Sequence, residues 1–475
     1  MGADGERDAT MHDGPDGAPS EPVGATIRPI TRAGRRHPCP NCGSQSVARI
    51  MVGLPAPGVL EDREREAGEY ILGGCMVWPD MPRFHCHRCG WEWAPPRGSA
   101  EDDWSGLDAG PSIEPIERRS WLASELTLLF PPVISDERKR LIASIAAPAD
   151  AVHRGRIDYS RWASMPLPEL VAPGVAERLP EIRDGWFAYE RDADPEAARQ
   201  RVAWHVNFAD PLLFGFYGEF PFAQDEVQVA EHPALASVRE ALLADGLPAL
   251  TEEGGQPTPV LVAGVERRIA IDTAPDVGAG RPYGLYGGRN LHSVSDAAVK
   301  RAIVRLVPPT RTNVLAIAAP RESGSRRPYT REEIERTLRT AYTGFRAAVL
   351  ESRRLVAERA AHVQAAGGLV LSTEAGVALG PAPARPAVAE VVVHTGFWGC
   401  GAFGGNRVLM TLLQVIAAQA AGVDRVVTYA GEPAARSSVD RALAIARDLT
   451  FVTGRDALID RIAALGLAWG NSDGN

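Results

Sequence analysis

Four cysteines near the start of the sequence form two C-x-x-C pairs. Cys39 and Cys42 make the first pair, Cys86 and Cys89 the second, and a glycine follows each pair. Two such pairs can place four thiolates tetrahedrally around one zinc ion, a ligand set typical of structural sites. Two disulfides are the alternative, and they fit poorly with a protein that we expect to remain unsecreted because it lacks an apolar N-terminal segment. The cysteines therefore predict a structural zinc site.

A glycine-rich segment at residues 394–406 has the sequence HTGFWGCGAFGGN. Glycine lets backbone amides approach phosphate oxygens closely, and a helix that starts at the end of such a loop adds partial positive charge. Asn406 is suited to cap that helix. A tight turn with packed aromatic rings is the alternative for an isolated glycine loop. Cys400 beside His394 suggests a nucleophile, but no general base accompanies it, so phosphate binding is favoured.

A second group of polar residues lies upstream, as VNFAD at 206–210, GFYG at 215–218 and FAQDE at 222–226. A strand end, a glycine turn and adjacent carboxylates would bring Asp225 and Glu226 to the rim of a pocket. Burial or a like charge could raise the pKa of one carboxyl into the range of acid/base catalysis. In isolation, QDE would be a solvated helix start; its combination with the glycine loop favours a functional role.

Taken in order, these segments resemble the poly(ADP-ribose) glycohydrolase family, whose macrodomain carries V-D-F-A-N, a G-G-G turn, Q-E-E and G-N-W-G-C-G-A-F-G-G-D. An AYTGF segment at 341–345 also matches, and the resemblance covers roughly residues 120–465. It implies a catalytic Glu226 with Asp225 as its acidic neighbour, no cofactor for catalysis, and ADP-ribose or an ADP-ribosylated macromolecule as partner. The ligand-binding residues it suggests are Asn207, Asp210, Gln224, Tyr286, Gly399, Gly401, Ala402, Phe403, Gly404 and Tyr429. For Tyr286 a core or turn position is the alternative.

The sequence departs from the family pattern at the turn and in the acids. GFYG replaces the glycine triplet, Asp225 replaces a glutamate, and Asp210 stands where the family has asparagine. We expect Phe216 and Tyr217 to lie near the distal ribose and to block polymer chains or reshape the pocket. The expected activity is therefore hydrolysis of an ADP-ribosyl bond. The alternatives are a non-catalytic ADP-ribose reader and a nucleic-acid-binding adaptor that acts through the zinc site.

Residues 39–93 resemble small bacterial zinc ribbons, with a G-L-P-x-P segment, I-L-G-G-C and a final C-x-x-C-G-x-E-W. Zinc ribbons bind nucleic acid or protein, or only hold a fold together, and the sequence leaves these roles open. The formal net charge of −9 disfavours a nucleic-acid surface along the whole chain. No run of eighteen apolar residues occurs, so we expect no membrane partner and a cytoplasmic location.

Strand and helix patterns alternate through the rest of the chain. Strands are predicted at 202–208, 259–265, 313–318, 390–394 and 425–429, and helices at 407–421 and 438–448. A capping box, Thr330 to Glu333, predicts a long helix that runs to about residue 361. The expected fold class is α/β: a macrodomain-like three-layer α/β/α fold with a mixed sheet, a helical N-terminal extension and a small zinc ribbon. The expected organisation is a disordered tail (1–36), the ribbon (37–93), a linker (94–118), a helical accessory segment (119–200) and the macrodomain-like domain (201–470).

Overall fold

The computed structural model describes two compact units of the chain, residues 1–112 and 113–475. The described residues are 39, 41–42, 44, 46–51, 70–72, 84–89, 92–93, 113–169, 180–185, 187–189, 201–321, 326–367, 390–452 and 454–472. The predicted tail at 1–36 lies outside these residues, as does most of the predicted linker. No helix among the described residues is long and apolar enough to span a membrane.

The first unit contains a small four-stranded sheet with the strand order β2-β1-β3-β4. Its strands are β1 (Val47–Met51), β2 (Tyr70–Leu72), β3 (Phe84–Cys86) and β4 (Glu92–Trp93). Strand β3 pairs antiparallel with both β1 and β4. Strand β4 follows the second cysteine pair, and β3 carries Cys86 at its end.

The second unit is built on one eight-stranded mixed sheet with the order β5-β6-β11-β12-β8-β13-β14-β7. The strands are β5 (Glu117–Leu122), β6 (Arg156–Arg161), β7 (Glu181–Arg183), β8 (Arg201–Ala209), β11 (Val260–Ile271), β12 (Ile303–Ala318), β13 (Glu390–Thr395) and β14 (Arg425–Tyr429). Strands β5, β6, β11 and β12 pair antiparallel. From β12 through β8, β13 and β14 to β7 every pair is parallel.

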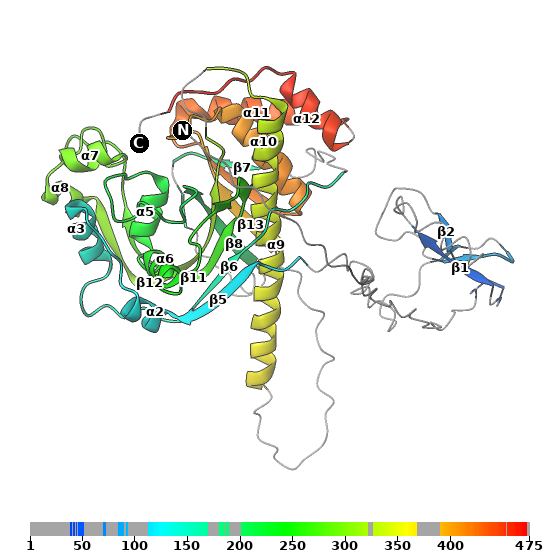
Figure 1. The fold of residues 1–475 in the computed structure, drawn as a ribbon, viewed down its shortest axis with the longest axis horizontal. Helices are drawn as coiled ribbons and strands as arrows, with labels where there is room; N and C mark the ends of the chain where they lie inside the picture. The colour runs from blue at the N-terminus through cyan, green and yellow to red at the C-terminus, as the bar shows by residue number, and fades with distance from the viewer. Residues whose placement is uncertain are drawn as a thin grey trace, which may run out of the picture. The chain divides into compact units, whose positions relative to one another are not determined.

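Helices cover both faces of this sheet (Figure 1). Along β12, Leu315 and Ile317 pack in one core with α9 (Arg331–Gly367) and α10 (Arg407–Ala421). Val314 and Ala316 alternate with them and pack in a second core with α2 (Ala123–Leu129) and α6 (Ala234–Ala244). Successive side chains of a strand point to opposite faces, so this alternation defines a three-layer α/β/α arrangement. The predicted fold class is confirmed.

The remaining elements of the second unit are shorter. They are α3 (Glu137–Ala146), α5 (Gln224–Glu231), β9 (Glu252–Glu253), β10 (Gln256–Pro257), α7 (Gly288–Ser293), α8 (Asp296–Arg301), the 3₁₀ helix η2 (Pro433–Ala435), α11 (Arg436–Asp448) and α12 (Arg455–Ala463). Helix α5 contacts β8 and β11, and α3 packs against α5.

The segment expected to be a helical accessory piece, 119–200, contains strands as well as helices. It carries α2 and α3, but it also contributes β5, β6 and β7, which occupy positions on both edges of the main sheet. Strand β6 pairs with the core strand β11. Strands from before and after residue 200 therefore belong to the same sheet, so the expected boundary at this residue lies within one domain.

Candidate functional site

The predicted functional segments follow strands that end at one edge of the sheet. β12, β8, β13 and β14 are parallel neighbours, so their carboxyl ends meet there. The acid-pair segment follows β8 and the glycine loop follows β13. In open α/β sheets this edge is where ligands bind.

The glycine loop is folded by turns that only glycine fits easily. Gly399 has a φ of +72°, and a β-carbon there would lie 2.5 Å from the Ala319 side chain. Gly405 donates its amide to the Gly399 carbonyl at 2.8 Å, and a β-carbon at Gly405 would lie 2.7 Å from that same oxygen. The backbone therefore folds back on itself at a distance that a side chain would prevent.

Several backbone amides of this loop are left without an internal acceptor. Cys400 and Gly404 donate their amides to Phe397 and Gly401 within the turns. Among the hydrogen bonds of the described residues, none has the amide of Gly401, Ala402 or Phe403 as donor. All three residues are partly exposed. Consecutive amides in turn conformation form a concave donor set that suits an anion.

Side chains from neighbouring elements fix the loop in place. The Trp398 indole donates to the Ile317 carbonyl at 2.9 Å, and Gln414 of α10 donates to the Gly396 carbonyl at 3.1 Å. Asn406 accepts from the amides of Val408 and Leu409, which confirms it as the cap of α10. The loop amides thus precede the start of a fifteen-residue helix, whose dipole favours negative charge there.

The acid pair lies in the first turn of α5 and is almost fully buried. Asp225 is 7% exposed and Glu226 4%. Glu226 Oε2 accepts from the Ala223 amide at 2.7 Å, and Asp225 Oδ1 accepts from the Glu226 amide at 2.9 Å. Burial and then the charge of Glu226 raise the pKa of Asp225 well above its ordinary value. A buried carboxyl whose pKa is raised, next to a second buried carboxyl, is an arrangement suited to acid/base chemistry.

Gln224 joins the acid pair to the end of β8. Its Oε1 accepts from the Phe208 amide at 2.8 Å, and its Nε2 donates to the Val206 carbonyl at 3.2 Å. The Phe208 ring in turn lies 3.5 Å from where a β-carbon of Gly396 would be. The acid helix and the glycine loop therefore meet at Phe208. Phe208 thus contacts both the first residue of the acid helix and the start of the glycine loop.

Residues 289–436 match the family model of the poly(ADP-ribose) glycohydrolase catalytic domain, described as having a macro domain fold. Over these residues the chain is similar to that family. The match includes the glycine loop and AYTGF, while the acid pair at 225–226 lies before it. No curated protein sequence matches the chain.

Solved poly(ADP-ribose) glycohydrolase structures are also similar to this chain. The enzyme from Thermomonospora curvata is 15% identical, with 64% of this chain and 98% of that chain covered and a TM-score of 0.29. The enzyme from Deinococcus radiodurans in complex with ADP-ribose is 12% identical, with 69% and 94% covered and a TM-score of 0.26.

In this macro fold the GFYG turn is packed differently from the expectation. Tyr217 is 8% exposed, its hydroxyl donates to Glu240 of α6 at 2.8 Å, and it accepts from the Val133 amide. The Tyr217 ring therefore belongs to the core that includes α6, and its place relative to a distal ribose stays a prediction. A β-carbon at Gly218 would lie 2.4 Å from the Val133 carbonyl, so this glycine permits the close approach.

Asn207 and Asp210 occupy different surroundings. Asn207 is fully buried, and its Nδ2 lies 3.5 Å from the Asp225 carbonyl while its Oδ1 has no partner among the described atoms. Asp210 caps a turn by accepting from the Leu212 amide at 3.0 Å. Asn207 thus lies at the acid pair, whereas Asp210 organises the turn that follows β8.

The two candidate tyrosines are also placed differently from each other. Tyr286 is half-buried, and the next residue, Gly287, donates its amide to the Phe222 carbonyl just before the acid pair. Tyr429 is 4% exposed, and its hydroxyl donates to the Ala188 carbonyl and lies 3.2 Å from His394 Nδ1. Tyr286 therefore stays a candidate beside the acids, while the ring of Tyr429 is held in the interior.

Cys400 is not activated as a nucleophile. Its thiol donates to the Trp398 carbonyl, and burial raises its pKa above the usual range. The protonated thiol is the unreactive form. The interpretation that favoured a ligand-binding loop over a cysteine nucleophile is consistent with this environment.

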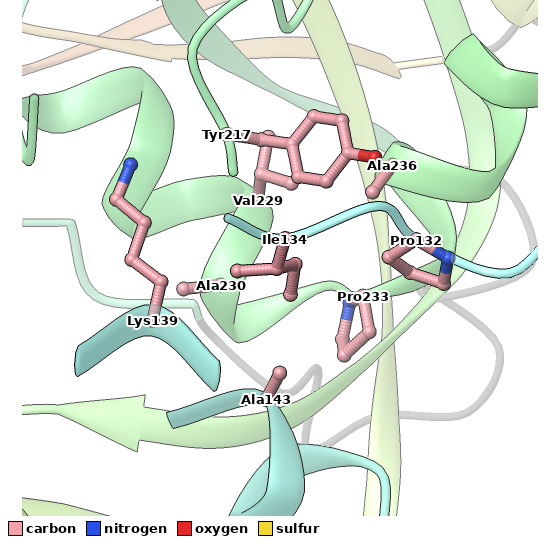
Figure 2. A pocket seen from close by; sticks show the side chains of 9 residues that line it. All are labelled: Pro132, Ile134, Lys139, Ala143, Tyr217, Val229, Ala230, Pro233 and Ala236. Atoms are coloured by element: carbon pink, nitrogen blue, oxygen red, sulfur yellow. The ribbon is translucent and has the colours of Figure 1, made fainter. Parts of the chain in front are cut away.

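A small apolar pocket lies behind α5, away from the acids (Figure 2). Its lining is Pro132, Ile134, Lys139, Ala143, Tyr217, Val229, Ala230, Pro233 and Ala236. Neither Asp225 nor Glu226 lines it. Lys139 borders it with its aliphatic chain, while its nitrogen points away from Ala143 and Pro233. This pocket belongs to the packing between α3, α5 and α6.

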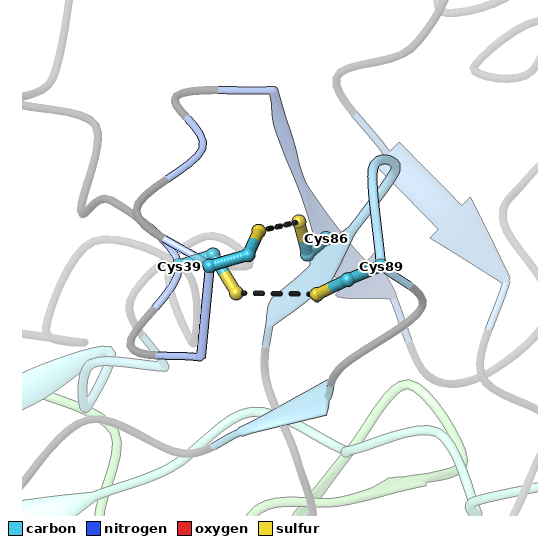
Figure 3. A group of neighbouring side chains, drawn as sticks. Cys39, Cys86 and Cys89 are labelled. Carbon is cyan, nitrogen blue, oxygen red and sulfur yellow. Dashed lines mark hydrogen bonds between the residues drawn. The ribbon is translucent and has the colours of Figure 1, made fainter.

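The four predicted zinc ligands come together in the first unit (Figure 3). Their sulfur atoms all lie within 4.8 Å of one another. Cys39 and Cys89 have sulfurs 3.6 Å apart, as do Cys42 and Cys86. A tetrahedron with Zn–S bonds of about 2.3 Å has edges of roughly 3.8 Å, whereas a disulfide bond measures about 2.05 Å. The donor set therefore fits a metal ion and all four cysteines are free thiols.

Proposed function

We propose that this protein is an ADP-ribosyl glycohydrolase in which Glu226 is the general acid and base. The single observation that carries the proposal is that Phe208 contacts both Gln224, the first residue of the helix that bears the acid pair, and Gly396, at the start of the loop that bears the amides of 401–403. The loop amides suit the diphosphate of ADP-ribose, and the acids suit cleavage of a glycosidic bond. The family of residues 289–436 supports this ligand.

In the proposed reaction Glu226 gives its proton to the leaving oxygen on the anomeric carbon of the distal ribose. The bond between that carbon and oxygen breaks, and an oxocarbenium-like state forms. The ionised Glu226 then takes a proton from water as the water oxygen bonds to the anomeric carbon, which restores the acid. The glycine loop orients the sugar by holding the diphosphate. Asn207, Gln224 and Asp225 are proposed to keep the acid in place.

Exchange of the proposed acid for its amide tests this role. Glu226→Gln keeps an oxygen that can accept from the Ala223 amide but cannot transfer a proton. We expect release of ADP-ribose to fall by about 10³-fold or more, with the affinity for ADP-ribose within about threefold of wild type. Glu137→Gln is the matched control, because Glu137 also lies in the first turn of a helix but is 92% exposed. A fully active Glu226→Gln protein would refute the assignment.

The substrate is identified by parallel assays of ADP-ribose release from poly(ADP-ribose), from mono-ADP-ribosylated protein and from ADP-ribosylated nucleic acid. Because Tyr217 lies in the core, it does not exclude polymer substrates. Tight ADP-ribose binding without release from any of the three would show a reader in place of a hydrolase. Calorimetric titration of ADP-ribose into the whole protein separates these outcomes.

For the first unit we propose a structural zinc ion held by Cys39, Cys42, Cys86 and Cys89, with nucleic acid or protein as the partner of the ribbon. The tetrahedral spacing of the sulfurs supports the metal. Cys86→Ser should reduce the zinc content measured by plasma mass spectrometry from one ion per chain to none. Binding of DNA by the intact chain that is lost in this variant and falls with salt would support the partner.

A further inference from the structure

Lys139 is a buried cation next to the acid pair. It lies in the first turn of α3 and is 3% exposed. Its Nζ donates to the Phe216 carbonyl at 2.8 Å and lies 5.8 Å from the centre of the Phe222 ring. Phe216 belongs to the turn after β8, and Phe222 immediately precedes α5. One ammonium group therefore contacts two points of the segment that leads into the acids.

Carboxyl groups from three segments interact electrostatically with this ammonium. They are Asp136 at the start of α3, Glu219 after the turn, and Asp225 and Glu226 in α5. Asp136 also pairs with His292 of α7 at 2.8 Å. Burial lowers the pKa of Lys139 to about 8, and the four carboxyls limit that fall by favouring the charged form. Lys139 reciprocally opposes the rise in the pKa of Asp225.

The choice of lysine at this position is informative. Of the 51 Lys and Arg residues in the chain, only Lys139 and Lys300 are lysines. Many ion pairs of the described residues use arginine, as in the pair between Arg267 of β11 and Glu231 of α5. A guanidinium group carries five donors in a rigid fork, whereas an ammonium is a compact charge that fits against one carbonyl and an aromatic ring.

We propose that Lys139 is the positioning residue of the acid pair. Its ammonium holds the turn through the Phe216 carbonyl and supplies the positive charge against which Asp225 and Glu226 are arranged. Two adjacent buried carboxyls repel each other when both are ionised, and a buried cation offsets that repulsion. The catalytic meaning rests on the proposed function of Glu226. The electrostatic coupling itself can be measured without any reaction.

The direct test uses the scarcity of lysine. Protein labelled with ¹³Cε-lysine gives two side-chain signals in NMR spectra, and Lys300→Arg assigns them. In wild type we expect the Lys139 signal to titrate near 8. Glu226→Gln should lower the pKa of Lys139 by about one unit or more, because a nearby opposite charge is removed. Glu137→Gln should leave it unchanged.

Two outcomes of the titration would overturn the proposal. One is a Lys139 signal that titrates together with Lys300, because the ammonium would then not be buried. The other is a Lys139 pKa that is equal in wild type, Glu226→Gln and Asp225→Asn, because the charges would then not be coupled. Both results are independent of enzymatic activity, so they remain decisive if the protein does not hydrolyse ADP-ribosyl bonds.

A second measurement links the coupling to the proposed reaction. Lys139→Met keeps an unbranched chain of similar length but removes the charge, and Lys300→Met is the matched control. The acid must start protonated, so its loss of the proton gives the alkaline limb of the pH–rate profile for ADP-ribose release. We expect this limb to move to higher pH in Lys139→Met, since the acids lose a stabilising cation. A purely structural role would lower the amount of folded protein without moving that limb, and this result would overturn the proposal. Absence of release by wild type would refute the proposed function alone.

Discussion

The glycine loop and the acid-pair helix follow neighbouring parallel strands, yet they are held by different kinds of contact. The loop presents backbone amides, and its shape depends on glycines whose β-carbons would clash, such as Gly399 and Gly405. The acid pair presents side chains, and its position depends on groups far away in the sequence, such as Lys139. A site built from backbone amides therefore tolerates few substitutions within its own short segment. A site built from side chains depends instead on residues throughout the domain.

Gly399→Ala should have the largest effect on the loop side. The new β-carbon would lie 2.5 Å from the Ala319 β-carbon and 3.0 Å from Met410 Cε, and the φ of +72° is strained for alanine. We expect the loop to shift, ADP-ribose affinity to fall by at least about tenfold and stability to fall by about 1–3 kcal/mol. Calorimetric titration and thermal unfolding measure the two effects.

Gly246→Ala separates strain from the clash. Gly246 has a φ of +68°, but nothing lies within 4 Å of its β-carbon position. Its variant should lose only the stability that the positive φ costs and should keep ADP-ribose affinity. Equal effects of the two variants on affinity would mean that the loop shape is not what binds the ligand.

The sequence predicts the loop side of this comparison better than the acid side. The loop, its cap Asn406 and helix α10 were all predicted, because glycines, a capping residue and an apolar helix are local signals. The capping box at 330–333 was confirmed in the same way, with Thr330 and Glu333 bonded reciprocally, although α9 extends to Gly367. Short-range patterns also gave the order of strands and helices.

The parts that sequence reasoning missed depend on tertiary packing. Lys139 lies in a charged run, Asp136-Glu-Arg-Lys-Arg, which has the composition of a solvated helix face. Only the packing of α3 against α5 buries it. Tyr217 was expected at the ligand because of its place in a motif, but the turn directs its ring toward α6. In the same way, β6 joins the sheet by pairing with β11, and β5 joins it by pairing with β6.

Tyr217→Phe tests whether the turn before the acid-pair helix contributes to stability or to ligand binding. We expect a moderate effect on stability. The variant loses the hydrogen bonds to Glu240 and the Val133 amide, so stability should fall by about 1–2 kcal/mol, while the affinity for ADP-ribose stays unchanged. Tyr159→Phe is the matched control: the Tyr159 hydroxyl is buried with no partner among the described atoms, so its removal should cost nothing. Urea unfolding measures both. A loss of ADP-ribose affinity in Tyr217→Phe without a matching loss of stability would show that Tyr217 takes part in ligand binding.

His205 joins the two regions and gives the smallest expected effect. On β8 it stacks on His394 of β13, with ring centres 4.3 Å apart, and both of its nitrogens are buried without a partner among the described atoms. Burial, and then the neighbouring His394 and His232, hold the pKa of His205 well below 6.5. Its imidazole is therefore neutral in the folded state.

Protonation of the unfolded chain determines the sign of the resulting pH dependence. Below about pH 6.5 the unfolded chain binds a proton at this histidine that the folded protein does not, so stability is present above that pH and is lost as the pH falls. His205→Phe keeps a ring in the stack and removes the group that takes up a proton on unfolding. Between pH 6 and 4.5 its free energy of unfolding should fall less steeply than that of wild type, by up to about 1.4 kcal/mol per pH unit. Urea unfolding at a series of pH values measures the slopes, and parallel slopes would mean that His205 is already charged or solvated between the two strands.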